Sequence, residues 1–366
     1  MKADRVEEQR FVARGASVTE LANLDILRSV AVLLVVAAHF LMYSQIAASR
    51  VSALAPWMGL TGVCLFFVHT CMVLMFSLER DPHSGRFYLR RVFRLFPLWL
   101  IVLAAVVLLR VPVAPSFAPH FGYVVPSGAE LLANTTMTMN LWFGARLVGA
   151  SWSLPIEAQM YLLLPLLFFF ICSTRALWVL LAVDALAIVS VWAVLGYRSV
   201  PAATLATCIP YFLPGVMAYA LTKRVRPNLP PWAFPVFLAG LVAGHLRFGT
   251  PFRSAFFCLS IGLALPFFRQ ISWRPVVRAA HLIARYSYGI YLCHIPAICV
   301  GIYYLRTHSL PVRLAGGLIT FVVLPVALYH GVEAPMIRLG SKLSKKIESG
   351  PAPRMNEKNM SLETAP

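Results

Sequence analysis

Long apolar runs follow one another along almost the whole of this 366-residue chain. We count ten, at about 26–46, 57–78, 95–112, 152–172, 177–195, 203–222, 233–249, 254–269, 286–305 and 314–333. A helix needs about 20 apolar residues to cross a bilayer, and a helix satisfies its own backbone hydrogen bonds there. Several runs are shorter, so tilted or re-entrant helices are expected among them. The runs predict an all-α fold: a polytopic integral membrane bundle of about ten transmembrane helices.

The charges are unbalanced, with 32 Lys and Arg against 14 Asp and Glu and a formal net charge of +18. With 59% hydrophobic residues and no evident soluble domain, this excess does not indicate nucleic-acid binding. Many basic residues stand between apolar runs, and the positive-inside rule then predicts both termini in the cytoplasm. We expect a cytoplasmic N-terminal segment at 1–24, an integral membrane domain at 25–336 and a basic, disordered cytoplasmic tail at 337–366.

The seven cysteines lie almost entirely within or at the ends of apolar runs, without a C-x-x-C or Cys/His metal-binding spacing. We interpret them as small buried hydrophobic residues and expect no metal site. The chain also lacks a P-loop, a G-x-S-x-G motif and an H-E-x-x-H motif. No permanently bound cofactor is expected.

Two ionisable residues, Arg28 and His39, stand eleven positions apart in the first apolar run. Eleven residues make about three helical turns, so both side chains share one face, about 16 Å apart along the axis. An ionisable residue inside a membrane span is costly and marks a functional site by default. A neutral imidazole can take a proton from a hydroxyl near neutral pH. We therefore predict that His39 is a catalytic base; a packing histidine bonded to a neighbouring helix is the alternative.

Three arginines, Arg90, Arg91 and Arg94, precede the third apolar run in FYLRRVFRLFPLW. Arg91 and Arg94 are three residues apart and share a helical face. A cluster of guanidinium groups at a membrane surface suits the binding of phosphate. A topogenic or lipid-headgroup patch is the alternative reading of the same cluster.

Glu157, in SWSLPIEAQMYLLLP, is one of few acidic residues between the first and last runs. A carboxylate at the outer end of the fourth run needs a partner. His39 is expected in the same half of the bilayer, and a carboxylate there would orient its imidazole and raise its basicity. The alternative is a structural ion pair with an arginine.

Four further polar residues lie in or beside apolar runs. We expect His69 to be a packing residue and His294 to bond across helices. Asp184 would pair with an arginine, and Glu333 would cap or ion-pair at the inner end of the last helix.

These motifs resemble those of acyltransferase family 3, in the family's order. They are LDILRSVAVLLVVAAHF, LRRVFRLFP, SWSLPIEAQMYLLLP, YFLPGVMAYAL, YSYGIYLCHIP and VEAP, which together span most of residues 24–336. The resemblance implies an O-acyltransferase of the cell inner membrane that takes an acyl group, often acetyl, from cytoplasmic acyl-CoA. The acceptor would be a hydroxyl of a carbohydrate or glycolipid, such as O-antigen or exopolysaccharide. Membrane lipids and polysaccharide-assembly proteins are the other expected partners.

On this hypothesis the catalytic residues are His39 and Glu157. His39 would act as general base on the acceptor hydroxyl or carry the acyl group transiently, and Glu157 would orient His39 or balance its charge. The phosphates of acyl-CoA, a substrate and not a resident cofactor, would bind Arg90, Arg91 and Arg94, together with Arg28. The alternative function is a proton-coupled transporter or flippase of a glycolipid or small solute, because an internal His and Glu also suit proton coupling. No internal repeat is evident, which counts against the transporter.

The chain departs from the family pattern in two places. His69-Thr70-Cys71-Met72 stands where the family usually has Leu-Ser-Gly-Phe, and Glu157-Ala158 stands where it often has two adjacent acids. The second departure leaves Glu157 as the single carboxylate of its stretch.

Overall fold

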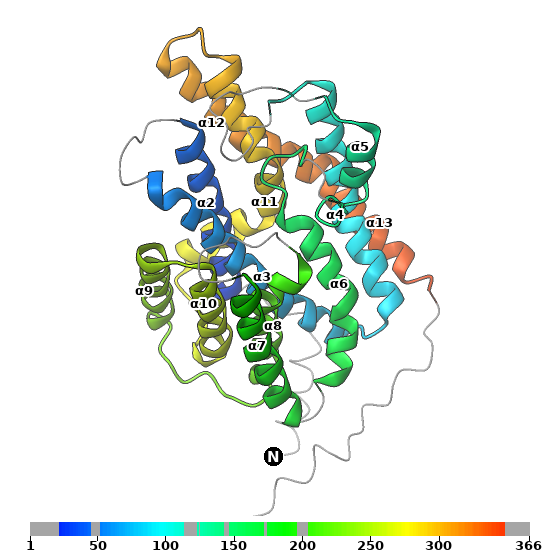
Figure 1. Cartoon of the computed structure of the whole chain (residues 1–366), viewed down its shortest axis with the longest axis vertical. Coiled ribbons are helices and arrows are strands. Elements are labelled where there is room, and N and C mark those ends of the chain that lie inside the picture. The colour runs from blue at the N-terminus through cyan, green and yellow to red at the C-terminus, as the bar shows by residue number, and fades with distance from the viewer. Residues whose placement is uncertain are drawn as a thin grey trace, which may run out of the picture.

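The computed structural model describes residues 22–44, 52–112, 123, 125–142, 146–171, 174–195 and 204–347, and these residues are overwhelmingly helical (Figure 1). The helices are α2 (Ala22–Ser44), α3 (Ala55–Arg80), α4 (Ser84–Leu108), α5 (Gly128–Thr135), α6 (Ser153–Phe170), α7 (Thr174–Leu195), α8 (Leu205–Thr222), α9 (Ala233–Phe248), α10 (Pro251–Ala264), α11 (Arg274–Cys299), α12 (Leu310–Leu328) and α13 (Ala334–Ser344). Single turns of 3-10 helix cover Ser52–Leu54 and Leu265–Phe267, and π-helical turns cover Val300–Tyr304 and Tyr329–Glu333. Over the described ranges no strand forms, so the all-α prediction is confirmed.

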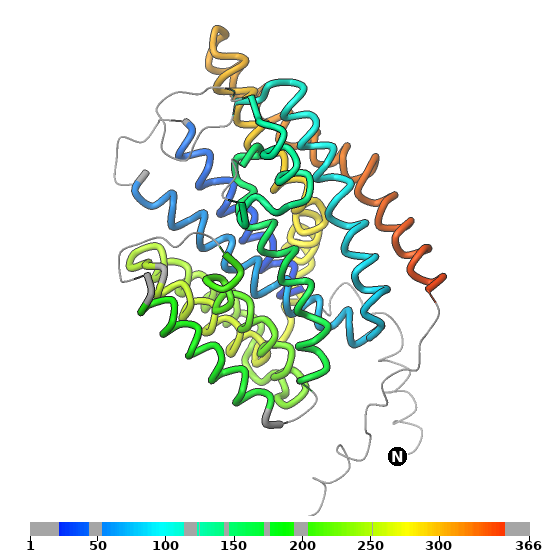
Figure 2. Tube along the Cα trace, turned by 45° about the vertical axis from the view of Figure 1, so that its right-hand side comes forward, coloured from blue at the N-terminus to red at the C-terminus, as the bar shows by residue number. Residues whose placement is uncertain are grey.

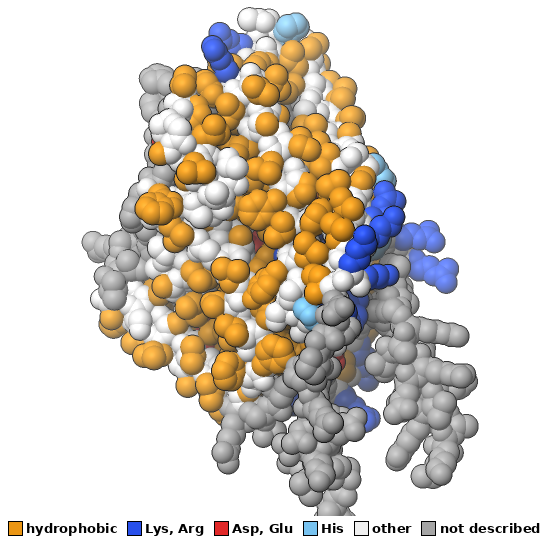
Figure 3. Space-filling view, turned by 90° about the vertical axis from the view of Figure 1, so that its right-hand side faces the viewer, with side chains coloured by type: hydrophobic (Ala, Val, Ile, Leu, Met, Phe, Trp, Pro, Cys, Tyr) orange, Lys and Arg blue, Asp and Glu red, His pale blue; other side chains and the backbone are white. Residues whose placement is uncertain are grey.

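Seven helical spans in the described part of the chain are long and apolar enough to cross a membrane. They are Ala22–Tyr43, Ala55–Arg80, Ser84–Leu108, Ser153–Phe170, Ala176–Ala193, Leu205–Thr222 and Leu310–Ser344. The apolar helices Ala233–Phe248 and Phe252–Phe267 are shorter. Figure 3 shows hydrophobic side chains spread over most of one face, with Lys and Arg gathered toward its edges, as a lipid-facing surface requires. The chain is a multi-pass membrane protein; the count of ten and the side of each terminus stay predictions.

Helix α3 lies inside the bundle, against α2 on one side and α8 on the other (Figures 1 and 2). The rings of Phe67 on α3 and Phe212 on α8 stack with their centres 4.0 Å apart. α11 packs against α2 and α12, and α13 runs along α4. This arrangement brings α2, α3, α4 and α11 around one region of the interior.

Helices α3 and α8 approach closely because Gly215 has no side chain. A Cβ at that position would lie 2.2 Å from the carbonyl oxygen of Val68 and 2.8 Å from the Cβ of Cys71. Small residues at helix contacts are typical of membrane bundles, where close backbone approach provides the packing energy.

We expect Gly215→Ala to destabilise the protein by about 1–3 kcal/mol, because the added methyl group forces two packed helices apart. Gly240, on α9, is the matched control, since a Cβ there meets nothing within 4 Å. Gly240→Ala should be neutral or stabilise by up to about 1 kcal/mol through helix propensity. Thermal unfolding of both variants in detergent measures the difference; equal unfolding midpoints would contradict the close contact.

Two helices extend beyond the apolar runs of the sequence. α4 begins at Ser84, so the arginines that precede the third apolar run lie on the same helix as that run. The first turn of α4 is capped by the imidazole of His83, which accepts from the backbone N–H of Arg86. A hydropathy criterion leaves these arginines out of the helix. In the structure each of them either lies beside a carboxylate or lines a cavity. α12 continues through a π-helical turn into α13, so residues 337–344 of the expected tail are helical. Residues 1–21 and 348–366 lie outside the described ranges.

A short helix, α5, forms in the long connection between α4 and α6. Ser127 and Glu130 form a reciprocal capping box at its start. The buried indole of Trp99 on α4 donates to the carbonyl of Asn134, 2.8 Å away, which ties α5 to the bundle. Leu141 and Trp142, which follow α5 in the chain, are exposed.

Candidate active site

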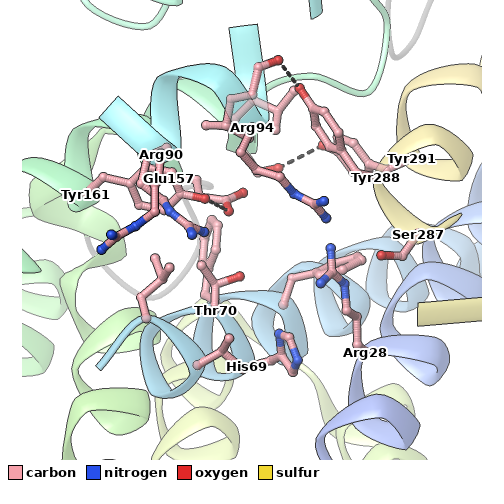
Figure 4. Close-up of a pocket in the computed structure, with 18 of the residues that line it drawn as sticks. Arg28, His69, Thr70, Arg90, Arg94, Glu157, Tyr161, Ser287, Tyr288 and Tyr291 are labelled. Carbon is pink, nitrogen blue, oxygen red and sulfur yellow. Dashed lines mark hydrogen bonds between the residues drawn. The ribbon is translucent and has the colours of Figure 1, made fainter. Parts of the chain in front are cut away.

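A cavity of about 260 Å³ lies between α2, α3, α4, α6, α11 and α13 (Figure 4). Its polar lining residues are Arg28, His69, Thr70, Arg90, Arg91, Arg94, Ser153, Glu157, Tyr161, Ser287, Tyr288, Tyr291 and Ser341. Four guanidinium groups thus share the lining with one carboxylate. All four arginines that were predicted to bind phosphate line this cavity. Arg28 comes from α2, and the other three come from α4.

Three of these arginines have a buried nitrogen without a hydrogen-bond partner within the described ranges. These atoms are Nε of Arg28, Nη2 of Arg90 and Nε of Arg91. The guanidinium carbon of Arg91 lies 5.8 Å from the ring centre of Phe87, a cation–π distance. A buried donor without a partner costs free energy, which an anionic ligand in the cavity would recover.

Two of the four arginines, Arg90 and Arg94, are ion-paired at the edge of the cavity. Nη1 of Arg90 lies 2.5 Å from Oδ2 of Asp81, and Nη1 of Arg94 lies 2.6 Å from Oε1 of Glu333. The side chain of Glu333 is fully buried, so the ion pair expected of it is confirmed and joins α4 to the end of the π-helical turn. These carboxylates neutralise part of the positive charge when no ligand is bound.

Asp81 lies in the turn between α3 and α4. Burial by itself raises the pKa of the Asp81 carboxyl, but the hydrogen bond and charge of Arg90, the backbone of His83 and the charge of Arg86 outweigh burial. The pKa of Asp81 is therefore below its ordinary value.

We expect Asp81→Asn to remove a pH-dependent part of the stability. Because the pKa of Asp81 is lower in the folded chain, its contribution is fully present above the ordinary value of about 4 and is lost as the pH falls through the folded value. Unfolding midpoints of the two proteins should differ at pH 6 to 7, on the order of 1 °C or more, and converge at acidic pH. A constant difference at every pH would contradict this.

Glu157 meets the cavity arginines and not His39. The hydroxyl of Tyr161, one turn further along α6, donates a short hydrogen bond to Oε1 of Glu157. Arg28, Arg91 and Glu157 line the same cavity. Glu157 lies apart from His39 because the second turn of α6 faces α4, which carries the guanidinium cluster, whereas His39 faces α11.

His39 lies on α2 beyond the cavity lining. It is half-buried, and its Nδ1 is 2.8 Å from the carbonyl oxygen of Val35 and 3.3 Å from Nε2 of His294 on α11. The two imidazole rings are 4.9 Å apart between centres. The prediction that His294 bonds across helices is confirmed, and its partner is the predicted catalytic base.

Two tyrosines of the cavity wall were not predicted from the sequence. Tyr288 and Tyr291 on α11 line it; Tyr288 donates to the carbonyl of Leu95, and Tyr291 donates to the carbonyl of Ala150 at 2.5 Å. Two phenols three residues apart in an otherwise apolar run were the available signal. His69 also lines the cavity, with a buried Nδ1 that has no partner among the residues described.

Comparison with known families matches residues 21–330 to the acyltransferase domain of family 3. The chain belongs to acyltransferase family 3. With its membrane-crossing helices it is a membrane acyltransferase, and Arg28, His39, Glu157 and the arginines of α4 fall within the matched range. No curated protein and no solved structure matches the chain.

Two predictions concern residues of this acyltransferase outside the cavity. The expected pairing of Asp184 with an arginine is wrong: Asp184 on α7 is buried, and neither carboxylate oxygen has a partner among the described residues. The prediction that the cysteines are buried is confirmed for those that the structure describes; Cys172 lies outside the described ranges. Six of them are free and buried: Cys64, Cys71, Cys208, Cys258, Cys293 and Cys299.

Proposed function

We propose that this acyltransferase moves an acyl group, acetyl in the first instance, from acyl-CoA to a hydroxyl of a carbohydrate or glycolipid acceptor. The observation that carries the proposal is the cavity in which Arg28, Arg91 and Arg94 converge inside an apolar bundle. Four guanidinium groups beside one carboxylate form a binding site for a polyanion. The phosphates of coenzyme A supply such charges.

The position of His39 supports the chemistry. Arg28 and His39 lie on one unbroken helix, α2, so the rise per residue separates them by about 16 Å along its axis. A pantetheine arm is long and uncharged, and it would carry the thioester from the phosphates in the cavity toward His39. Tyr291 lines the cavity one turn before His294, which contacts His39, so α11 joins the cavity wall to the proposed base.

In the proposed reaction His39 acts as general base. The acceptor O–H bond breaks, its proton passes to His39, and the oxygen forms a bond to the carbonyl carbon of the thioester. The carbon–sulfur bond then breaks, and the leaving thiolate takes the proton back from His39. Glu157 acts at the cavity, where it balances the charges of Arg28 and Arg91 and holds them when no donor is bound.

The acceptor classes that fit are O-antigen, exopolysaccharide and related glycans. On this proposal the protein lies in the cell inner membrane, with the arginine cavity on the cytoplasmic side, where acyl-CoA is found. Polysaccharide-assembly proteins are proposed neighbours.

The test is an assay with purified protein in detergent or liposomes and acetyl-CoA labelled in the acetyl group. We expect release of free CoA and transfer of label to glycans extracted from the membrane. NMR comparison of cell-surface glycans with and without the gene would identify the acetylated position. No consumption of acetyl-CoA, together with proton-driven solute uptake into liposomes, would overturn the proposal in favour of the transporter.

A further inference from the structure

We propose that His294 is the positioning residue for His39: its Nε2 accepts a hydrogen bond from the Nδ1–H of His39 and leaves Nε2 of His39 as the basic nitrogen. This inference rests on the proposed function, in which His39 takes the hydroxyl proton. It gives His294 the task that the sequence assigned to Glu157.

The protonation of His294 follows from its backbone contact. Its Nδ1 lies 2.7 Å from the carbonyl oxygen of Tyr291, and a carbonyl oxygen only accepts, so the hydrogen is on Nδ1. In a neutral imidazole the other nitrogen, Nε2, then has a lone pair. His294 is fully buried in α11, which favours this neutral form and fixes the direction of the lone pair.

The protonation of His39 follows in the same way. Its Nδ1 lies 2.8 Å from the carbonyl oxygen of Val35, so Nδ1 carries the hydrogen and shares it between that oxygen and Nε2 of His294 at 3.3 Å. Nε2 of His39 is left with the lone pair. One hydrogen on each ring satisfies all three contacts without placing two donors face to face.

The pair also suits the charged state that forms during reaction. When Nε2 of His39 takes the proton, its Nδ1–H becomes a stronger donor, and the bond to His294 becomes charge-assisted. The opposite tautomer of His39 would put two lone pairs against each other and lose the contact to Val35. A neutral acceptor thus holds the catalytic ring in one tautomer, as a carboxylate does in other histidine-based sites.

The test compares two amides at one position. In His294→Gln the amide oxygen reaches about where Nε2 lies and can accept a hydrogen bond from His39. In His294→Asn the side chain is shorter, so its amide stays near the Tyr291 carbonyl and does not reach His39. We expect His294→Asn to lower kcat about 30-fold with the KM for acetyl-CoA unchanged, in the range found for partners that orient functional histidines. His294→Gln should keep kcat within about 3-fold of the native value, a loss below 1 kcal/mol.

The second measurement does not need catalysis. Nitrogen NMR of protein labelled with ¹⁵N-histidine, with His39→Ala to assign the signal, should show His39 protonated at Nδ1 in the native chain and a larger Nε2–H fraction in His294→Asn. Full activity of His294→Asn with loss in His294→Gln would mean a structural role through Tyr291 and overturn the inference. So would equal kcat values for the two variants, or a native His39 protonated at Nε2.

These outcomes separate this inference from the proposed function. If the native protein does not consume acetyl-CoA, the proposed function fails, and the NMR measurement still decides the hydrogen bond. His245→Gln is the control for losing a buried histidine. Its imidazole bonds Thr61 and Ser254 and does not line the cavity, so its kcat should be native even where its unfolding midpoint falls.

Discussion

His39→Ala is expected to lower kcat for acyl transfer about 1000-fold, the middle of the range that general acid–base catalysis contributes. The half-buried ring contacts Tyr43 and His294, so its removal trims one side chain at the edge of the bundle. The KM for acetyl-CoA should change little, because the proposed function places the donor phosphates on the level of Arg28. Release of free CoA by purified protein in the presence of acceptor measures both constants.

The control for His39→Ala is His308→Ala. His308 is exposed in the connection between α11 and α12 and does not line the cavity, so its loss should leave kcat unchanged. Native unfolding midpoints for both variants would show that the bundle is intact. If His39→Ala kept kcat within a few-fold of the native value, His39 would not be the base, and the cavity arginines would support donor binding alone.

The parts of this site that the sequence predicted are those set by a single helix. Arg28 and His39 share a face because eleven residues complete three turns of one unbroken helix, α2. The same periodicity groups Arg91 and Arg94 on α4. The ion pair of Glu333 was also predicted, because a buried carboxylate needs a partner, and Arg94 supplies it.

The parts that the sequence missed depend on how helices are rotated against one another. Glu157 was placed opposite His39 from its depth in the membrane, but depth does not fix which neighbour a helix faces. α6 turns Glu157 toward the guanidinium groups of α4, and α11 brings His294 to His39. Such rotations follow from close contacts like that at Gly215, which hydropathy does not report.

The helix boundaries failed for a related reason. An apolar-run criterion stops where charges begin, yet α4 continues back to Ser84 through four arginines. Asp81 pairs with Arg90, and Glu333 pairs with Arg94, so the charges are compensated by residues far along the chain or in a turn. Only the folded arrangement reveals this compensation.

Arg91→Met is expected to weaken CoA binding about 100-fold, whereas the neighbouring Arg90→Met should cost about 5-fold or less. Arg91 has no ion pair within the described ranges, and its Nε is a buried donor without a partner, so its positive charge is available to a phosphate. Arg90 also has an unpartnered buried donor, Nη2, but its charge is already paired with Asp81 through Nη1 at 2.5 Å, and a phosphate must compete with that carboxylate. Methionine keeps the apolar volume of either side chain and removes the charge.

The comparison of CoA with pantetheine, which lacks the phosphates, isolates the charge effect. Titration calorimetry of the purified protein should show the 100-fold loss for CoA in Arg91→Met and an unchanged affinity for pantetheine, because pantetheine has no phosphate for Arg91 to bind. Arg86 lies 3.7 Å from Asp81 and keeps that carboxylate compensated in Arg90→Met, so the control is not confounded by an unpaired charge. Equal losses in the two variants would mean that the cluster acts through its total charge, and equal losses for both ligands would mean that Arg91 shapes the bundle instead of binding phosphate.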